Sequence, residues 1–514
     1  MQKIINLSLS PKRASDEKYY KHDAAEFLHI NEEEITSIEI LRKSIDARKK
    51  FVKVNVQLDV WWDEVPQNKD NFQLQLQDVT GKPEVIIAGA GPAGLFAALK
   101  LIEKGLKPLV FERGKDVKER KKDIQNINTN KGLNPNSNYC FGEGGAGAFS
   151  DGKLYTRSKK RGDVKRILDI LQLHGAPKDI LSDAHPHIGT NKLPGIIVKI
   201  RETIRNAGGE VFFNSRVEDF IIEDDTVKGI VTQNGEKVFG KAVILATGHS
   251  ARGIYEMMHQ KNILIEEKPF AMGLRVEHPQ GLIDSIQYSC KIRSDYLPAA
   301  AYNLVSQVQD RGVYSFCMCP GGFIVPAATA SDEIVVNGMS PSMRNSEFAN
   351  SGMVVEIRTE DFPEKEKYGA LAGLKFQQST EKLAFQNGGR GLVAPAQRLN
   401  DFVNGKISAS LPETSYHPGI ISSPLHFWLP EHIGKRLQEG FKMFEKKMRG
   451  YLTNQAVVLG VESRTSSPVR IPRDKDTFQH PQIKNLYPCG EGAGYAGGII
   501  SAAVDGERCA DRIV

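Results

Sequence analysis

The pattern of apolar and polar residues shows a strand–helix–strand unit that begins near residue 84. Val85 to Ala88 form a continuous apolar run, typical of a strand buried on both faces. Residues 92–104 have the apolar spacing of a helix, and residues 108–113 form a second run suited to a strand. This order predicts a βαβ unit with two parallel strands.

More helices and strands follow this unit. A long segment rich in Asn and Gly, residues 123–163, precedes a predicted helix at 163–173. Long loops of this kind inside compact domains usually wrap a ligand. A second amphipathic helix is predicted at 194–207. Three further strands are predicted at residues 217–222, 227–233 and 242–248.

The pattern changes after residue 264. Residues 265–460 read as short strands interrupted by Gly and Pro, and end in an amphipathic helix with Ile433 and Met448 on its apolar side. Residues 486–500 then return to a strand, a glycine-rich turn and a closing helix. We therefore predict that residues 265–460 are a domain inserted into a discontinuous α/β domain, residues 84–264 and 461–514.

The first 80 residues form a separate predicted module. Strands are expected at 4–9, 38–41 and 51–60, with a short helix at 24–29, which indicates a small α+β fold. We expect the basic segment 42–50 to be a solvated loop. The polar residues 66–83 are predicted to be a linker.

The glycines of the βαβ unit indicate what it binds. Gly89, Gly91 and Gly94 occupy the GxGxxG positions, which permit a tight turn, a close approach of pyrophosphate and close helix packing. Pro92 suits the first turn of the helix, whose N-terminus attracts phosphate. Glu112, 23 residues after Gly89, is placed to accept hydrogen bonds from both hydroxyls of an adenosine ribose. The unit therefore predicts a dinucleotide site.

Composition and charge restrict the other function classes. The 514 residues carry a net charge of +6, a mild bias that gives no indication of nucleic acid binding. No apolar run of 18 residues and no signal-peptide pattern occurs, so we expect a cytoplasmic protein without a membrane span. The six cysteines contain no CxxC. Cys317 and Cys319 form a CxC that is either redox-active or, as we favour, two small side chains beside a turn.

Several motifs carry a resemblance to a known family. The glycine-rich start with Glu112, the strand end at Gly248 and the turn after Cys489 resemble the glutathione-reductase-type FAD domain. More narrowly, five segments resemble the bacterial uncharacterized FAD-dependent dehydrogenase family. These segments are Cys140 to Leu154, His185 to Thr190, Ala246 to Ala251, Phe316 to Gly322 and Gly490 to Gly498.

The resemblance implies a fold and a cofactor site. The expected architecture is α/β: a Rossmann-type FAD-binding domain with an inserted α+β substrate domain and the small N-terminal module. Glu491 stands where the superfamily usually has Asp, which hydrogen-bonds the ribityl chain, and Gly497 and Gly498 would present N–H groups to the flavin. The residues predicted to bind FAD are Gly89, Gly91, Pro92, Ala93, Gly94, Glu112, Arg113, Gly144, Gly145, Gly248, Gly490, Glu491, Gly497, Gly498 and Ile499.

Candidate catalytic residues are less specific. Lys153 lies in a glycine-rich loop expected to cover the flavin, and His249 and His278 are candidates for acid–base chemistry on the substrate side. Arg464 is either a ligand for an anionic substrate or part of a surface ion pair. No residue spacing indicates a metal site.

Three hypotheses follow for the function. The first is an FAD-dependent oxidoreductase that exchanges hydride with a small organic substrate held between the two domains. No second βαβ fingerprint is visible, so NAD(P)H, if used, binds transiently. The second is an FAD-dependent RNA-modifying enzyme, motivated by local basic charge alone, and the third is a non-catalytic FAD-binding scaffold protein.

Overall fold

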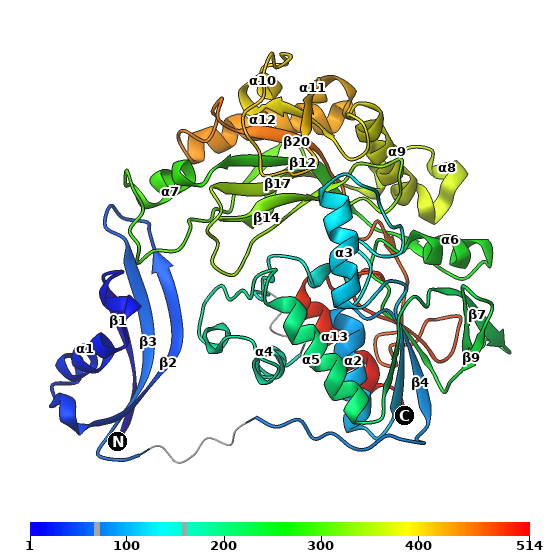
Figure 1. The fold of residues 1–514 in the computed structure, drawn as a ribbon, viewed down its shortest axis with the longest axis horizontal. Coiled ribbons are helices and arrows are strands. Elements are labelled where there is room, and N and C mark those ends of the chain that lie inside the picture. Colours follow the sequence, from blue (N-terminus) through cyan, green and yellow to red (C-terminus); the bar gives the residue numbers. More distant parts are fainter. Residues whose placement is uncertain (66–71, 157–161) are drawn as a thin grey trace.

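The computed structural model describes residues 1–65, 72–156 and 162–514. Two large layers and one small module are arranged around a central junction, with the small module beside both layers (Figure 1). The parallel-sheet layer contains both the first glycine-rich turn and the carboxyl-terminal helix, and the antiparallel layer covers it. The mixed α/β class predicted from the sequence is confirmed.

The parallel sheet has five strands in the order β22-β10-β4-β5-β6. Its strands are β4 (Glu84–Ala88), β5 (Lys107–Phe111), β6 (Glu210–Phe212), β10 (Val243–Leu245) and β22 (Leu486–Pro488). Ile87 faces the helices α2 (Pro92–Glu103), α5 (Leu193–Asn206) and α13 (Ile499–Asp511), whereas Ile86 faces the opposite core. Alternation along β4 thus buries both sides, which explains its continuous apolar sequence.

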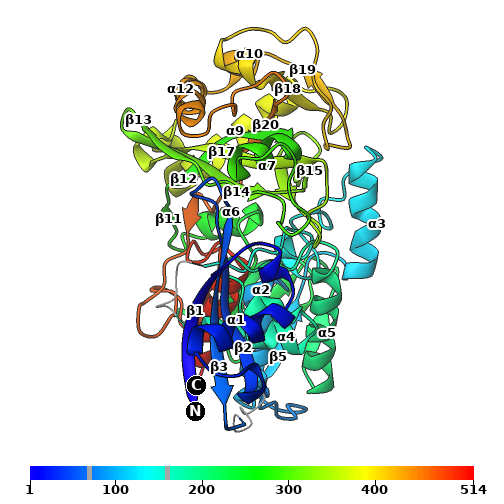
Figure 2. The same ribbon diagram turned by 90° about the vertical axis from the view of Figure 1, so that its left-hand side faces the viewer.

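The opposite face of this sheet packs against smaller elements. A three-stranded meander contains β7 (Val217–Glu223), β8 (Thr226–Thr232) and β9 (Lys237–Phe239), and α6 (Arg252–Gln260) lies beside it. Two further helices, α3 (Val117–Asn128) and α4 (Val164–Leu173), follow the βαβ unit along the chain. In the perpendicular view, α3 stands at the edge of the molecule and extends toward the upper layer (Figure 2).

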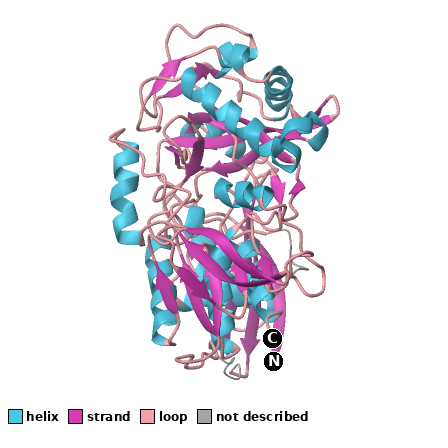
Figure 3. Cartoon of the chain, turned by 90° about the vertical axis from the view of Figure 1, so that its right-hand side faces the viewer, coloured by secondary structure: helices cyan, strands magenta, loops and turns pink. Residues whose placement is uncertain are grey.

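The antiparallel layer is built on a seven-stranded sheet in the order β13-β14-β17-β12-β20-β18-β19. Its strands are β12 (Phe270–Pro279), β13 (Val305–Val308), β14 (Arg311–Cys319), β17 (Phe348–Ile357), β18 (Ala394–Arg398), β19 (Ile420–Ser422) and β20 (Val457–Glu462). The long helix α12 (Glu431–Lys447) packs on its outer side with α10 (Leu399–Val403) and α11 (Leu425–Trp428). The separation of this sheet from the parallel one is also visible in Figure 3.

Smaller helices and strands complete the antiparallel layer and its junction with the parallel-sheet layer. The helices are α7 (Gln280–Tyr288), α8 (Lys365–Tyr368) and α9 (Ala372–Gln386). The strand pairs are β15 (Phe323–Pro326) with β16 (Val336–Met339), and β11 (Glu266–Glu267) with β21 (Val469–Arg470).

The prediction of only short strands in this region is wrong. β12 and β17 have ten residues each and pair along their whole length. Gly273 interrupts the apolar pattern of β12, but it belongs to the strand because a Cβ there would lie 2.0 Å from the Met353 carbonyl oxygen. The glycine marks close backbone approach between strands and not a break.

The amino-terminal module has strands β1 (Gln2–Leu9), β2 (Ile35–Asp46) and β3 (Lys53–Trp62), with α1 (Lys18–Leu28) packed on them. The prediction of a loop from residue 42 is wrong, because β2 continues to Asp46. The Lys43 N–H donates to the Ser182 carbonyl, and the Ala184 N–H donates to the Lys43 carbonyl, at 3.0 Å each. These bonds to a distant segment extend the strand and connect the module to the parallel-sheet layer.

The carboxyl-terminal helix α13 lies directly against α2. A Cβ at Gly506 of α13 would lie 2.0 Å from the Ala93 carbonyl oxygen of α2. The two helices, separated by about 400 residues of sequence, therefore approach closely enough at Gly506 for backbone contact, and their buried side chains share one core. No helix among the described residues is long and apolar enough to cross a membrane.

We predict that Gly506→Ala separates these helices and lowers the free energy of unfolding by about 1–3 kcal/mol, the usual cost of overpacking. Gly253→Ala in α6 is the matched control, because a Cβ at Gly253 meets no atom within 4 Å. The control should be neutral or slightly stabilising, since Ala is the better helix former. Urea unfolding followed by circular dichroism measures both, and equal midpoints for the two variants would contradict the close helix contact.

Candidate functional site

Three turns meet at the carboxyl edge of the parallel sheet. Gly89, after β4, has φ +108°, and a Cβ there would lie 2.4 Å from the Ala246 carbonyl oxygen after β10. A Cβ at Gly492, after β22, would lie 2.8 Å from the Gly248 carbonyl oxygen. Only glycine permits this approach, so the turns that the sequence places far apart form one continuous backbone surface.

Two helix N-termini point at the same surface. Gly91 is the N-cap of α2 and Gly498 is the N-cap of α13, and neither can supply a capping side chain. Gly147, in the glycine-rich loop, lies between them: a Cβ there would be 3.4 Å from both the Pro92 and Ile499 side chains. Backbone N–H groups and the positive ends of two helix dipoles are therefore available to an anionic ligand.

Residues predicted to bind the cofactor are brought together at this edge. A Cβ at Gly490 would be 3.1 Å from the Ala93 side chain, and one at Gly145 would be 3.1 Å from the Gly91 Cα. Around Gly248, by contrast, a Cβ would meet no atom within 4 Å. Gly497 and Gly498 are exposed. Glycine backbone thus lies open beside the N-termini of α2 and α13, where the Gly498 N–H donates to the Ser501 hydroxyl at 3.0 Å.

The glycine-rich loop is held by a buried arginine that sequence reasoning missed. Arg120 of α3 is fully buried and donates to three loop carbonyls, those of Asn138, Tyr139 and Glu143, at 2.8–3.1 Å. Its side chain also fills the space that a Cβ at Gly142 would need. One signal was present in the sequence: Arg120 is the basic residue on the apolar face of α3, between Val117 and Ile124.

Glu112 makes contacts within the protein that the sequence did not predict. Its buried carboxylate accepts from the N–H groups of Gly114 and Gly142 at 2.9 Å and of Ala90 at 3.0 Å. A carboxylate has about four acceptor positions, so one remains for a ribose hydroxyl instead of the two expected. Glu112 therefore joins the first turn to the glycine-rich loop, where the Gly144 N–H donates to the Ala90 carbonyl at 2.8 Å.

Arg113 follows Glu112 and packs over the Phe141 ring, with its guanidinium carbon 3.8 Å from the ring centroid. Its Nη2 donates to the Asn136 side chain at 2.7 Å. Burial lowers the pKa of Arg113 to about 10, which leaves the side chain charged at neutral pH. The residue adds positive charge next to Glu112.

Glu491 and His249 lie in the turns that follow β22 and β10. The Glu491 carboxylate accepts from the Ser467 N–H at 3.0 Å and covers Gly497, where a Cβ would be 2.3 Å from its Oε2. His249 Nδ1 is 4.0 Å from Glu491 Oε1. Burial, aided by nearby Arg464, lowers the pKa of His249 to about 3. The imidazole is therefore neutral at pH 7, which disfavours it as a general acid.

Lys153 reaches from the glycine-rich loop into the antiparallel layer. Its Nζ donates to the Met318 carbonyl and lies 3.8 Å from Cys319 Sγ and 3.9 Å from Asp151 Oδ2. Burial opposes its charge, but Cys319 and Cys317 of β14, when ionised, and Asp151 together raise the pKa of Lys153. Lys153 is therefore a cation at the junction of the two layers.

Arg464 is buried at this junction and is not part of a surface ion pair. Its guanidinium donates to Glu381 at 2.9–3.0 Å and to Glu333 at 2.9 Å, and to the hydroxyls of Thr329 and Ser250. Arg252 of α6 binds the same two carboxylates at 2.5 and 2.6 Å. Although burial opposes it, the two arginines lower the pKa of Glu381 well below its usual range.

This four-residue group, Arg252, Arg464, Glu333 and Glu381, is the junction clamp. Its members come from α6, from the segment after β20, from the loop before β16 and from α9, so it ties the two layers together. The protein oxygens around Arg464 satisfy its donors, which leaves a positioning role for this residue.

His278 belongs to the core of the antiparallel layer. It is fully buried, its Nε2 lies 2.8 Å from the Tyr451 carbonyl, and its ring packs on the Tyr451 ring. Burial lowers its pKa to about 4. His278 therefore lies in a packed core without exposed surface, a placement that does not fit the prediction of an acid–base residue facing the substrate.

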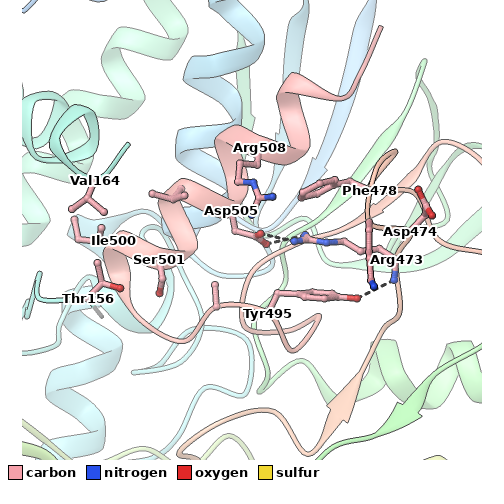
Figure 4. A pocket seen from close by; sticks show the side chains of 13 residues that line it. Thr156, Val164, Arg473, Asp474, Phe478, Tyr495, Ile500, Ser501, Asp505 and Arg508 are labelled. Carbon is pink, nitrogen blue, oxygen red and sulfur yellow. Dashed lines mark hydrogen bonds and ion pairs between the residues drawn. The ribbon is translucent and has the colours of Figure 1, made fainter. Parts of the chain in front are cut away.

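A pocket of about 270 Å³ opens beside α13 (Figure 4). Arg473 lies between the Phe478 and Tyr495 rings, with its guanidinium carbon 4.2 and 4.0 Å from their centroids, and forms a bidentate pair with Asp505. Cys489, Asp505 and Cys509 behind it have metal-like spacing. However, Arg473 Nη1 already donates to Asp505 and lies 3.3 Å from Cys509 Sγ, so a guanidinium takes the place of a metal cation.

Comparisons with known proteins give the cofactor. Residues 269–465 match the family described as FAD-dependent protein, C-terminal domain-like, and residues 197–296 match glucose inhibited division protein A. Residues 1–61 match a domain of unknown function. An uncharacterized protein of Clostridium beijerinckii is 41% identical over 99% of this chain and 97% of its own length. The chain belongs to a family of FAD-binding flavoproteins.

FAD is thus the cofactor of this flavoprotein. Partial relatives are a thiamine thiazole synthase of Aeropyrum pernix, 28% identical over 33% of this chain and 56% of that protein, and a tRNA uridine 5-carboxymethylaminomethyl modification enzyme of Alkaliphilus metalliredigens, 36% identical over 18% and 13%. The flavin-dependent brominase Bmp2 shares 13% identity at a TM-score of 0.36, covering 83% of this chain and 77% of its own. That likeness is too distant to carry an argument.

We predict that Arg464→Met destabilises the flavoprotein by roughly 3–5 kcal/mol, because it leaves two buried carboxylates, Glu333 and Glu381, with Arg252 as their one remaining cation. The control is Lys382→Met on α9, next to Glu381, which breaks an exposed ion pair with Asp332. The control should change stability much less, since exposed pairs contribute little. Unfolding in urea at pH 7 measures both, and similar midpoints would show that the clamp does not stabilise the junction.

Proposed function

We propose that this protein is an FAD-dependent oxidoreductase that exchanges hydride between the flavin and an organic substrate bound between the two layers. In this proposal residues 84–264 and 461–514 hold FAD, and residues 265–460 cap it. The observation that supports it best is the meeting of three glycine turns and two uncapped helix N-termini on one backbone surface, beneath the antiparallel layer.

Different residues at that surface would bind different parts of the cofactor. The α2 N-terminus at Gly91 to Gly94 would hold the pyrophosphate, and Glu112 would accept one ribose hydroxyl. The α13 N-terminus at Gly497 to Ile499 would face the pyrimidine side of the flavin, where its dipole favours negative charge. Bound FAD supplies the redox chemistry, and the protein supplies orientation and electrostatics.

The remaining residues have supporting roles in this proposal. Neutral His249 would hydrogen-bond the flavin or substrate without gaining charge, and Lys153 would hold an anionic group at the junction of the layers. Glu491, whose pKa burial raises, would accept from a ribityl hydroxyl next to Gly497. Arg464 would position Ser250, the residue after His249, through its 3.3 Å contact.

A second candidate function is RNA modification by an FAD-dependent enzyme. The match of residues 197–296 to glucose inhibited division protein A, and the short match to a tRNA-modifying enzyme, favour it. The net charge of only +6 is weak support for phosphate binding. Filter retention of tRNA at low ionic strength distinguishes the two, and absence of retention removes the RNA hypothesis.

We predict that Glu112→Gln weakens FAD binding by roughly tenfold to a hundredfold, the loss expected when a charged acceptor becomes neutral. The matched control is Glu218→Gln on β7, an exposed residue outside the site. Fluorescence of FAD during titration of apoprotein gives the dissociation constants. Unchanged affinity in Glu112→Gln would place the cofactor elsewhere.

The oxidoreductase proposal predicts that the purified, yellow holoprotein loses its visible flavin absorbance when an electron donor is added without oxygen. NADH, NADPH and photoreduction should be compared, followed by reoxidation with candidate organic acceptors. Bleaching by light alone would exclude a pyridine-nucleotide donor but keep the redox proposal. A flavin that no donor reduces would favour the scaffold hypothesis instead.

A further inference from the structure

The end of β14 carries two cysteines on a distorted segment of strand. The pairing of β14 with β17 shifts register between Phe316 and Cys319. Cys317, in the middle of this bulge, has φ +45°, a left-handed conformation that costs a non-glycine residue of order 1–3 kcal/mol. Bulges often re-aim side chains next to functional sites.

Two cations hold this bulge from different layers. Arg275 Nη2 of β12 donates to the Cys317 carbonyl at 3.0 Å, and the Lys153 ammonium donates to the Met318 carbonyl. Arg275 is itself fully buried and paired with Glu462 at 3.2 Å. Hydrogen bonds from Arg275 and Lys153 therefore stabilise the unusual backbone conformation at Cys317, and Arg275 is itself held by Glu462.

The bulge separates the two thiols by accessibility. Cys317 is exposed, whereas Cys319 is 1% exposed. The Cys319 thiol folds back toward its neighbour, with Sγ 3.2 Å from the Cys317 carbonyl oxygen and 3.8 Å from Lys153 Nζ. An exposed cysteine thus precedes a buried one by two residues, and the Lys153 ammonium lies beside the buried thiol.

Metal binding does not explain this pair. Within residues 1–65, 72–156 and 162–514, the only group of three ligating side chains close enough to share an ion is the one filled by Arg473. A cation already lies beside Cys319 in the form of Lys153. An exposed cysteine two residues before a buried one suits thiol–disulfide exchange, in which the exposed thiol attacks first and the buried thiol resolves the mixed disulfide.

We propose that Cys317 and Cys319 are a redox-active dithiol that exchanges with low-molecular-weight disulfides at the junction of the two layers. Cys317 thiolate attacks the disulfide RSSR, forming a mixed disulfide and releasing one thiolate that is protonated to RSH. Cys319, deprotonated, then attacks Cys317 Sγ and releases the second RSH. Two cysteine thiols are oxidised to one intramolecular disulfide, and one external disulfide is reduced to two thiols. This step is independent of the flavin chemistry proposed above.

The surrounding charges determine the pH dependence of the exchange. Although the Cys317 residue is exposed, the protein atoms around its side chain partly desolvate the thiol and raise its pKa; Lys153 and Arg275 oppose this effect, while Cys319 and Glu462 add to it. The fraction of Cys317 present as thiolate is therefore small at pH 7. It increases with pH, and half-ionisation requires a pH above the usual pKa of a thiol. Removing the Lys153 charge by Lys153→Met should raise the pKa further and slow the exchange, by about tenfold for each unit.

The experiment uses the holoprotein equilibrated with mixtures of reduced and oxidised glutathione at pH 8. Remaining thiols are blocked with a maleimide in denaturant, and peptides are identified by mass spectrometry. We expect Cys317 and Cys319 to escape maleimide labelling together, in one peptide that contains an internal disulfide. Cys319→Ser should accumulate a glutathione adduct on Cys317, and Cys317→Ser should leave buried Cys319 unmodified.

Cys290→Ser is the matched control, because Cys290 is a partly exposed cysteine at the end of α7, outside the bulge. It should behave as the wild type. Flavin absorbance and circular dichroism verify that each variant is folded. A stable adduct on wild-type Cys317 without loss of Cys319, or no reaction of either thiol at any glutathione ratio, would overturn the proposal.

Discussion

Close backbone approach at the carboxyl edge of the parallel sheet is the constraint on which this structure depends. The turns after β4, β10 and β22 meet at distances that leave no room for a side chain at Gly89 or Gly492. Gly506 repeats the same condition between α2 and α13. A single Cβ would separate these elements, so the glycines are required for the close meeting of the turns and helix N-termini on which the proposed FAD site depends.

Buried charge organises the regions around that edge. Arg120 satisfies the carbonyls of the glycine-rich loop, and Glu112 fastens the same loop to the first turn. The junction clamp, containing Arg464 and Glu381, performs the corresponding task between the two layers. Such groups are costly to bury and costly to leave unpaired, so they specify one arrangement of the loop and of the layers.

The antiparallel layer covers the parallel-sheet layer and also brings ionisable side chains to the junction. Lys153, from the parallel-sheet layer, donates to the Met318 carbonyl in the bulge. Arg275 donates to the Cys317 carbonyl of the same bulge. The junction thus contains a neutral imidazole, an ammonium group and two thiols within reach of elements from both layers. His249, with a pKa of about 3, is neutral near pH 7 and is therefore poorly suited to act there as a general acid.

The sequence by itself determined the βαβ unit, the helices with clear apolar spacing such as α2, α5 and α12, and the glycines of the turns, because strand burial, helix spacing and glycine geometry are local properties. It named Glu112 and Lys153 as candidates but not their contacts within the protein. Only the tertiary structure decided that Arg464 is buried, that His278 lies in a core, that β2 extends to Asp46 and that Arg120 holds a loop. Each depends on partners far along the chain, and a local pattern contains no information about which distant carbonyl or carboxylate will satisfy a buried charge.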